Sequence, residues 1–304
     1  MSLQVERLSS ADALLDFLNR RDPRWIMVPN DWVFRGQADA AWSLLPSAFR
    51  TNFRYGAQRE FKLASTHREQ VEQEAELVHR FLRGLNQQGL PPPNEAAARW
   101  IDRAVMYEHF NGTQLWRNWP PEDLAPLVAL AQHHQIPTRL LDWTDNPLVA
   151  AYFGALEAAQ KGTESFAVWA AHLGFVRGAL RESPNYSRYR VDVVRPPRFS
   201  NPNLRAQSGV FTLLTDHARQ PHDAALLPAL DEIVSQIHAQ RERSGHSYSF
   251  PSLLKLEVPS SEAPKVLRYL AYEWISGTYL YPGLDGVVRG IRERAFWDDE
   301  RNSI

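Results

Sequence analysis

An arginine in the middle of an apolar strand is the sequence feature that most restricts how this chain can fold. The segment Trp32–Gln37 (WVFRGQ) is rich in aromatic and β-branched residues, which indicates a strand, and Arg35 is near its centre. A charged side chain in a buried strand has to be paired or has to point into a cleft, because an unpaired buried charge is very unfavourable. The fold must therefore bring Arg35 either a carboxylate, such as Asp39 or Asp142, or an open cavity that admits an anionic ligand.

The length and the charge balance of the chain indicate one globular unit. The chain has 304 residues, which is near the upper limit for a single hydrophobic core, and no repeat, low-complexity tract or Gly/Ser linker divides it. The 34 Lys and Arg residues nearly balance the 35 Asp and Glu residues. The chain as a whole therefore has no strong electrostatic attraction to nucleic acid or to an anionic membrane.

Several absences narrow the range of functions. There is no cysteine, which excludes disulfides, iron–sulfur clusters, thiolate nucleophiles and cysteine-based zinc sites. Motifs of P-loop, Rossmann, zinc-protease, serine-hydrolase and kinase proteins are also missing. The start of the chain is polar and its apolar stretches are far shorter than a bilayer span. We expect a cytoplasmic protein with no membrane partner and no metal.

Apolar periodicity predicts mostly helices early in the chain and mostly strands late in it, which is typical of an α+β fold. The predicted helices cover residues 11–18, 59–85, 95–107 and 122–134, a segment that begins at Asn146, and residues 262–275. The predicted strands cover residues 32–37, an extended piece from Trp42 to Arg50, and residues 165–173, 191–194, 210–214 and 253–258. On the long helix at 59–85, Glu69, Glu72, Glu74 and Glu76 are interpreted as a solvated outer face rather than a metal site.

A second group of polar residues surrounds a proline between residues 131 and 155. It contains His133, His134, Thr138, Arg139, Asp142, Thr144 and Asp145. Together they offer acid/base, anion-binding and hydroxyl groups. Structural roles stay open for single residues, because histidine is favoured at a helix C-terminus and Asp or Thr can cap a helix. Adjacent histidines face different directions on a helix, so a His–His metal pair is not expected.

Two later segments also combine polar residues with structure-breaking ones. In Asn203–Phe211, Gln207 is expected at the mouth of an apolar strand. In Tyr281–Gly286, a turn precedes a short helix, and Asp285 is the expected N-cap.

Taken together, these motifs resemble the FRG domain, a bacterial and phage family named after its Phe/Tyr-Arg-Gly motif. The matching residues are Phe34–Gln37 with Trp42 and Pro46, Gln132–His133, Pro137–Thr144, Pro147–Leu148, Ala150, Phe153, Arg205, Gln207–Phe211 and Tyr281–Gly286. The resemblance implies an FRG domain over residues 30–292 with a helical insertion at about 59–134, between a helical lead-in at 1–29 and a tail at 293–304. Where the family usually has Tyr-Gly after the histidine, this chain has His134 and Gln135, so His133 is the matching histidine.

The order of the motifs is also similar to the NAD-binding core of ADP-ribosyltransferases. Such a core has an aromatic-Arg-Gly strand, then a Ser/Thr-containing strand that leads into a helix with an Ala and a Phe, and finally a Glu or Gln before an apolar strand. The counterparts here are Arg35–Gly36, then Thr138–Thr144 with Ala150 and Phe153, then Gln207. This resemblance implies a single domain with a mixed, mainly antiparallel β core flanked by helices, and NAD or a similar nucleotide as substrate.

The resemblance also implies roles for individual residues. Arg35, His133 and Gln207 are the catalytic candidates. The candidates for binding NAD are Arg35, Gly36, Gln37, Thr138, Arg139, Asp142 and Thr144. Gln207 takes the place of the usual catalytic Glu; it can bind a ribose hydroxyl but supplies no negative charge. The predicted function is ADP-ribosyl transfer to a protein or nucleic-acid acceptor, or NAD cleavage, in a toxin or antiphage setting.

The residues leave two other functions open. One is a noncatalytic module that senses a nucleotide or phosphorylated ligand through Arg35 and Arg139, or that binds a protein partner. The other is a hydrolase of a phosphorylated or nucleic-acid substrate, which requires His133 and Asp142 within hydrogen-bond reach. An enzyme should bring Arg35, His133 and Gln207 to one open pocket, whereas a structural role for Arg35 predicts its closure against Asp142.

Overall fold

The computed structural model describes residues 3–26, 31–50, 53–55, 59–102, 115–198, 201–244 and 251–298, with the backbone alone for 53–55 and 59–61. Its strands are β1 (Gln4–Arg7), β2 (Trp32–Gln37), β3 (Phe53–Tyr55), β4 (Arg59–Phe61), β5 (Leu140–Thr144), β6 (Ser165–His172), β7 (Tyr189–Val194), β8 (Gly209–Asp216) and β9 (Leu253–Pro259). The α-helices are α1 (Ala11–Phe17), α2 (Pro23–Ile26), α3 (His67–Gln87), α4 (Glu95–Ala98), α6 (Ala125–His133), α7 (Pro147–Lys161), α8 (Leu173–Glu182), α9 (Pro202–Ala206), α10 (Leu230–Arg243), α11 (Ala263–Tyr272), α12 (Gly277–Leu280) and α13 (Leu284–Arg294). Four 3-10 helices complete the elements: η1 (Ser47–Phe49), η2 (Arg99–Ile101), η3 (Leu115–Arg117) and η4 (Ser260–Glu262).

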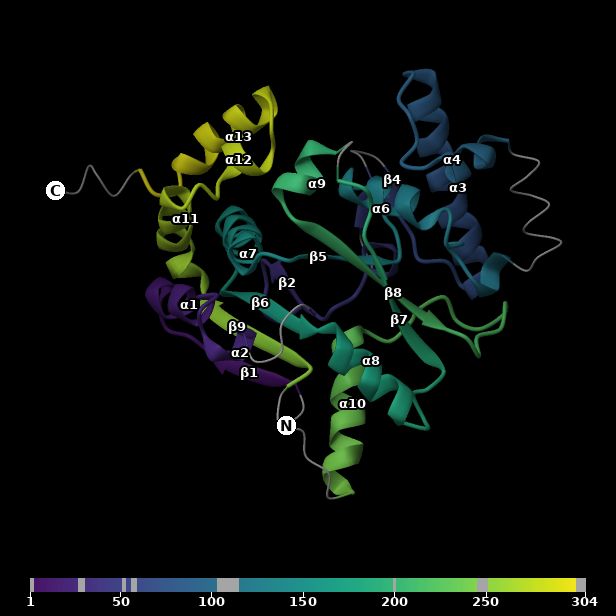
Figure 1. Ribbon diagram of the computed structural model, residues 1–304, viewed down its shortest axis with the longest axis horizontal. Coiled ribbons are helices and arrows are strands. Elements are labelled where there is room, and N and C mark those ends of the chain that lie inside the picture. The colour runs from purple at the N-terminus through teal and green to yellow at the C-terminus, as the bar shows by residue number, and fades with distance from the viewer. Residues whose placement is uncertain are drawn as a thin grey trace.

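A seven-stranded sheet in the order β1-β9-β6-β2-β5-β8-β7 forms the centre of the molecule (Figure 1). The pair β1–β9 is parallel and the other neighbouring strands are antiparallel. The strands β3 and β4 form a separate antiparallel pair. The α+β prediction is therefore confirmed as a mixed, mostly antiparallel sheet with helices around it.

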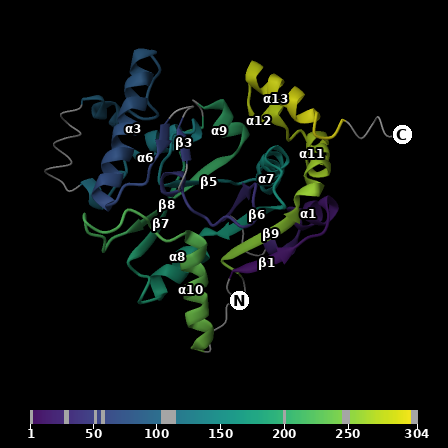
Figure 2. The same cartoon turned by 180° about the vertical axis from the view of Figure 1, so that it is seen from behind.

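Three apolar clusters hold the helices on this sheet. One joins α1, α7 and α11 to β2, β6 and β9, and a second joins α8 and α10 to residues of the same central strands. The third packs α3 and α6 against β5 and β8. Figures 1 and 2 show α11 on one side of the molecule, α7 close to the central strands, and α3 and α6 on the other side. Because all three clusters share one sheet, the described residues form a single domain.

The sheet is interrupted between β2 and β5. Strand β2 pairs with β6 along its whole length, from Trp32↔His172 to Gln37↔Ala167. Its pairing with β5 is confined to Phe34↔Thr144. The two strands therefore separate on the side of Arg35 and Asp142, and this separation leaves room for a pocket in the middle of the sheet.

Most of the predicted elements are confirmed, and the exceptions have local causes. The piece from Trp42 to Arg50 is not a strand; Pro46 leads into η1, where the Ser47 hydroxyl accepts from the backbone N–H of Thr138. The long helix begins at His67 rather than at residue 59, because Thr66 caps it in a capping box with Glu69.

Two further helices are shorter than predicted. The helix expected over residues 95–107 ends as α4 at Ala98 and continues as η2 to Ile101, and residues 103–107 lie outside the described residues. The helix α6 begins at Ala125 instead of Glu122, with a proline in its first turn. The predicted start of α7 is confirmed, since the Asn146 side chain accepts from the backbone N–H of Leu148.

Two structural features are absent from the described residues. No helix among them is both long enough and apolar enough to cross a membrane. The same residues contain no group of three or more His, Asp or Glu side chains placed to hold a metal ion.

Candidate functional site

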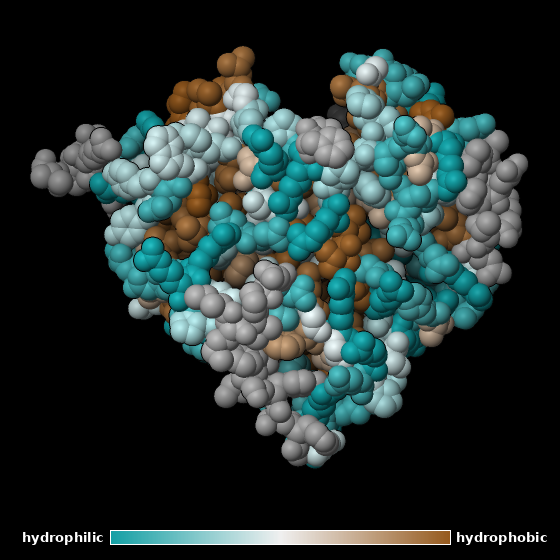
Figure 3. Space-filling view, viewed as in Figure 1, coloured by the Kyte–Doolittle hydropathy of each residue, from teal (hydrophilic) through white to brown (hydrophobic). Residues whose placement is uncertain are grey.

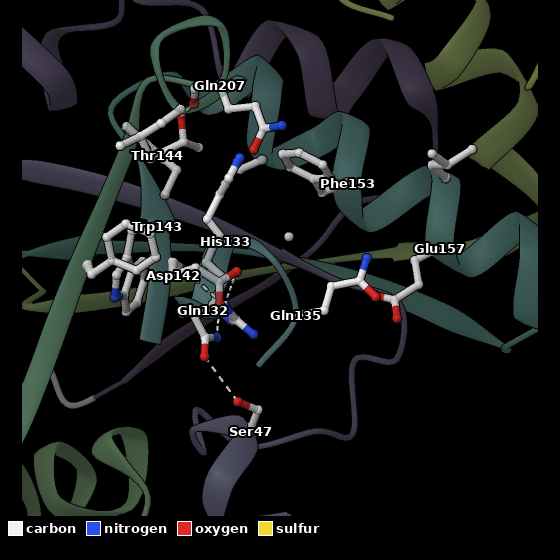
Figure 4. A pocket seen from close by; sticks show the side chains of 18 of the residues that line it. Ser47, Gln132, His133, Gln135, Asp142, Trp143, Thr144, Phe153, Glu157 and Gln207 are labelled. Atoms are coloured by element: carbon white, nitrogen blue, oxygen red, sulfur yellow. Dashed lines mark hydrogen bonds and ion pairs between the residues drawn. The ribbon is translucent and has the colours of Figure 1, made fainter. Parts of the chain in front are cut away.

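A pocket of about 520 Å³ lies where β2 and β5 separate (Figure 4). Residues of β2, β5, α6, α7 and the start of β8 line it, and Tyr281 and Arg289 from the C-terminal part of the chain close one side. This volume is within the range of sites that bind small molecules and cofactors. Arg35, His133 and Gln207, the three catalytic candidates, all line this pocket.

Arg35 is held at the pocket wall by one residue of β5. Its Nη1 donates to the carbonyl oxygen of Asp142 at 2.8 Å and lies 2.7 Å from the Oδ2 of the same residue. The side chain of Arg35 is 8% exposed, and its Nε is buried without a hydrogen-bond partner among the described residues. An unsatisfied buried donor of this kind is uncommon in folded proteins.

Asp142 is an ionised carboxylate that faces the pocket. The enclosing walls oppose its ionisation, but the charge and hydrogen bond of Arg35, together with the charge of Arg50, lower the pKa of Asp142 to about 2. Its side chain is 55% exposed, so one face of the carboxylate stays open to the pocket. The pair therefore presents a cation and an anion side by side.

A chain of hydrogen bonds positions the Asp142 carboxylate. Gln132 Nε2 donates to Asp142 Oδ1 at 3.2 Å (Figure 4). The other end of this amide, Gln132 Oε1, accepts from Thr138 Oγ1 at 2.8 Å and from Ser47 Oγ at 3.2 Å. Thr138 is fully buried and holds Gln132 through this hydrogen bond. It is not among the residues that line the pocket, so direct contact of Thr138 with NAD stays a prediction.

His133, in the last turn of α6, points toward the pocket, as Figure 4 shows. Burial, with a smaller contribution from His134, lowers the pKa of His133 to about 4, and the charge of Asp142 only partly opposes this shift. His133 is therefore neutral near pH 7 and can accept a proton or a hydrogen bond. His134 instead contacts the ring of Phe81, at 6.0 Å between ring centroids, so His133 is the inward histidine.

Thr144 and Gln207 join the ends of two strands at the pocket. Thr144 Oγ1 donates to the backbone carbonyl of Gln207 at 2.7 Å, and Gln207 Nε2 donates to the carbonyl of Leu280 at 3.1 Å. Ser208 follows with a positive φ of 50°, an uncommon conformation that turns the chain sharply from α9 into β8. The Gln207 side chain is thereby fixed at the mouth of β8, where the sequence predicted it.

Gly36 allows α7 to pack closely against β2. A Cβ at this position would lie 2.1 Å from the carbonyl oxygen of Ala150 and 2.4 Å from the backbone nitrogen of Gly154. The close approach of the α7 backbone explains the glycine at this position. Gly36 still contributes to the pocket wall, because α7 can pack against β2 only at this short distance.

Two of the predicted NAD-binding side chains are used elsewhere. Gln37 is buried, with Oε1 accepting from Trp169 Nε1 at 2.7 Å and Nε2 donating to the carbonyl of Ser43. Arg139 is 3% exposed and donates twice to Glu74, from Nε at 2.9 Å and from Nη2 at 3.0 Å. Neither side chain is among the residues that line the pocket, so their contact with a ligand stays a prediction that the described pocket does not support.

The partner of Arg139 corrects the interpretation of the long helix. Glu74 was expected on its solvated face but is 1% exposed, and it also accepts from Trp119 Nε1 at 3.1 Å and from Gln70 Nε2. The helix begins later than predicted, and the side that carries Glu74 packs against the third apolar cluster. A buried ion pair of this kind is structural.

Three charged pocket residues were not predicted from the sequence. Arg50 follows η1, and burial together with the charge of Arg35 lowers the pKa of its guanidinium. Glu157 is one turn after Phe153 on α7, a spacing that places both on one face of the helix. Arg289 of α13 lies over the ring of Tyr281, 4.2 Å from its centroid, and no local pattern near this residue predicted its place.

An enzyme was expected to bring Arg35 to an open pocket, and a structural Arg35 was expected to close against Asp142. The structure shows both arrangements at once. Arg35 shares one pocket with His133 and Gln207, and it is also closed against Asp142. The hydrolase reading has less support, because no hydrogen bond joins His133 to Asp142 among the described residues. The Asp142 oxygens are instead occupied by Arg35 and Gln132.

Comparison with known proteins identifies part of the chain. Residues 30–163 match the FRG domain family. This segment contains β2, β5 and the whole of α7, and hence Arg35, His133 and Asp142, whereas Gln207 lies outside it. No curated protein and no solved structure matches the chain significantly.

Proposed function

We propose that this chain, which carries an FRG domain over residues 30–163, binds NAD in the pocket between β2 and β5 and transfers its ADP-ribose to water or to an acceptor. The observation that carries the proposal is the convergence of Arg35, His133 and Gln207 on one cavity. Each of the three motifs lies in a strand or leads directly into one. These strands, β2, β5 and β8, are consecutive neighbours in the sheet. Segments far apart in the sequence thus contribute to one site.

The charges and rings of the pocket suit a dinucleotide. The guanidinium of Arg35 supplies positive charge at the pocket wall for a phosphate, and Arg50 and Arg289 add positive charge for a diphosphate. Phe153 and Tyr281 provide aromatic surface on which a base can stack. The resemblance to ADP-ribosyltransferases gives the same role to the arginine of the Arg-Gly strand.

The reaction needs a group that stabilises positive charge and a group that accepts a proton. When the bond between ribose C1′ and the nicotinamide nitrogen breaks, nicotinamide leaves with the electron pair and the ribose becomes cationic. The ionised carboxylate of Asp142 supplies negative charge in the pocket. Water or an acceptor hydroxyl then bonds to C1′, and neutral His133 accepts the released proton.

Gln207 has a positioning role in this proposal. Its amide N–H is held by the carbonyl of Leu280, which leaves the amide oxygen free to accept from a ribose hydroxyl. A glutamine cannot replace the charge of the usual glutamate, so the negative charge has to come from another carboxylate of the pocket. Gln207→Glu should therefore raise the rate of nicotinamide release, provided that the folded structure is kept.

Nicotinamide release from NAD, measured with NAD binding by calorimetry, tests the proposal. Arg35→Ala should abolish binding, and His133→Ala should keep binding but slow release about 100-fold. The matched control is Arg205→Ala, which removes an exposed arginine outside the pocket and should change neither. Wild-type protein that is folded and neither binds nor cleaves NAD would refute the proposal.

A noncatalytic module that senses a nucleotide or phosphorylated ligand is the second candidate. It is favoured by the closure of Arg35 against Asp142 and by the uncharged Gln207. A sensor should bind NAD, ADP-ribose or ADP with an affinity that depends on Arg35, while nicotinamide release stays at the rate of buffer alone. The same calorimetric and release measurements therefore separate the two candidates.

The proposed biological setting rests on analogy with the FRG family. We propose that the chain acts in the cytoplasm as a toxin or in antiphage defence, with a protein or nucleic acid as acceptor. Expression in bacteria should then lower cellular NAD and slow growth, and Arg35→Ala should relieve both effects. Normal growth and NAD level during high expression of the wild type would contradict this setting.

A further inference from the structure

The helix α13 (Leu284–Arg294) packs on the domain through a face on which two of the three buried residues are glycines. Gly286 and Gly290 are buried there, and a Cβ at these positions would lie 1.8 Å from the carbonyl oxygen of Tyr281 and 2.0 Å from Thr278 Oγ1. Glu293, one turn later, is buried and accepts from Tyr152 Oη at 2.6 Å and from the backbone N–H of Gly277. The orientation of α13 on the domain is thus fixed.

The opposite face of this helix is apolar and exposed. Leu284 is 85% exposed, Ile291 is 67% exposed, and Val287 and Val288 between them are each nearly half exposed. Their spacing of three and four residues places them in one continuous stripe. The hydrophobic area at the upper left of Figure 3 is in the same place as α13 in Figure 1. An exposed stripe of this kind on a fixed helix marks an interaction surface.

We propose that this stripe binds the same stripe of a second copy of the chain, with the two α13 helices antiparallel. The apolar residues are symmetric about the middle of the helix, so a twofold axis there brings Leu284 against Ile291 of the other copy and Val287 against Val288. The charges beside the stripe also complement themselves. Asp285 and Arg292 are both exposed, at opposite ends, and the antiparallel arrangement brings each close to the other residue of the second copy.

The expected dimer is weak and depends on concentration. Stable interfaces bury roughly 1,200–2,000 Å² in total, and a stripe of four side chains on each copy provides less than this. The inference does not rest on the proposed function, because it concerns the outer face of α13. The same helix nevertheless contributes Arg289 to the pocket, so the interface lies on the reverse side of a pocket wall.

Sedimentation equilibrium of the full chain, from about 1 to about 200 μM, tests the proposal in the concentration range of weak association. The wild type should shift from monomer toward dimer, and Ile291→Glu should remove the dimer by placing an unpaired carboxylate against Leu284 of the other copy. Leu90→Glu is the matched control, because Leu90 is 54% exposed on another part of the surface. Far-UV circular dichroism checks that each variant is folded.

Charge reversal makes the test specific to this geometry. Asp285→Arg and Arg292→Asp should each weaken the dimer at least tenfold, and the double variant should restore most of the affinity, because the two charges meet across the interface. Three results would overturn the proposal: a wild type that stays monomeric over the whole range, a dimer that Ile291→Glu does not affect, or a monomer whose stripe binds anionic lipid vesicles instead.

Discussion

Arg35 contacts both the backbone and the side chain of Asp142, through one guanidinium nitrogen that lies 2.8 Å from the carbonyl oxygen and 2.7 Å from Oδ2. These contacts cross the place where β2 and β5 no longer pair as neighbouring strands. The pair therefore links the two strands where their ladder hydrogen bonds are missing, while Arg35 Nε stays buried without a hydrogen-bond partner among the described residues.

Neutralising Asp142 should separate ligand binding from chemistry. Asp142→Asn keeps an acceptor for Arg35 but removes a negative charge that repels phosphates, so the affinity for ADP-ribose should rise about threefold to tenfold, or about 1 kcal/mol. Nicotinamide release should slow, because the variant lacks the carboxylate that faces the ribose. Calorimetry and release assays check this, with Asp192→Asn, at a partly exposed surface pair, as the control. An affinity that does not change would show that Asp142 and the ligand do not meet.

The ion pair of Glu74 and Arg139 should matter for stability alone. Glu74→Ala leaves a buried guanidinium without its carboxylate and should lower the free energy of unfolding by about 3–5 kcal/mol in urea titrations. The double variant Glu74→Leu with Arg139→Met should recover much of this loss, because no uncompensated charge remains. If the double variant is folded but has lost its affinity for ADP-ribose, Arg139 binds the ligand after all.

Two glycines should respond oppositely to the same substitution. Gly36→Ala forces a methyl group against the backbone of α7 and should lower the free energy of unfolding by about 3 kcal/mol. Gly84→Ala, on α3, meets nothing within 4 Å and should raise it by about 0.5–1 kcal/mol, since alanine favours the helix. Urea unfolding of the two variants beside the wild type gives both values. Equal small effects would mean that α7 does not approach β2 as closely as described.

Two buried histidines should make the fold sensitive to mild acid. Burial, and for His67 also the charges of Arg139 and Arg219, lowers the pKa of His67 and of His133 to about 4 from the ordinary value of 6.5. Both are neutral in the folded and the unfolded chain above pH 6.5. As the pH falls from about 6.5 to about 4, only the unfolded chain binds the protons, so stability is lost by up to about 3 kcal/mol for each histidine.

Urea unfolding at pH 7.5 and pH 4.5 checks this sign. The loss of stability between the two values should be smaller in His133→Gln than in the wild type, whereas His222→Gln, at an exposed position, should behave like the wild type. A protein that becomes more stable as the pH falls through this window would contradict the burial of both imidazoles.

Much of the fold was predictable because the signals were local. Asn146 before Pro147 marks the start of α7, and apolar β-branched runs mark β6, β8 and β9. The errors arose where a distant contact determines the structure. Ser47 belongs to a 3-10 turn because it bonds to Thr138, ninety-one residues away, and Glu74 is buried because Arg139 is its partner.

The candidate site shows the same division. Arg35, His133, Asp142, Thr144 and Gln207 could be selected as polar residues beside strands and helix ends, and the structure brings all five to the pocket. The sequence could not show which polar side chains bind other residues inside the fold instead of facing the pocket. Gln37 and Arg139 bind Trp169 and Glu74, partners that no spacing in the sequence reveals. Arg289 joins the pocket only because the glycines of α13 let that helix pack closely.

The most direct test of the central claim, that the gap between β2 and β5 is a nucleotide-binding site, is a crystal structure of the wild-type protein with ADP-ribose. We predict that the ligand fills the pocket between Phe153 and Tyr281, with a phosphate oxygen beside the Arg35 guanidinium and a ribose beside Asp142 and Gln207. ADP-ribose bound elsewhere on the chain, with this pocket filled by water alone, would contradict it.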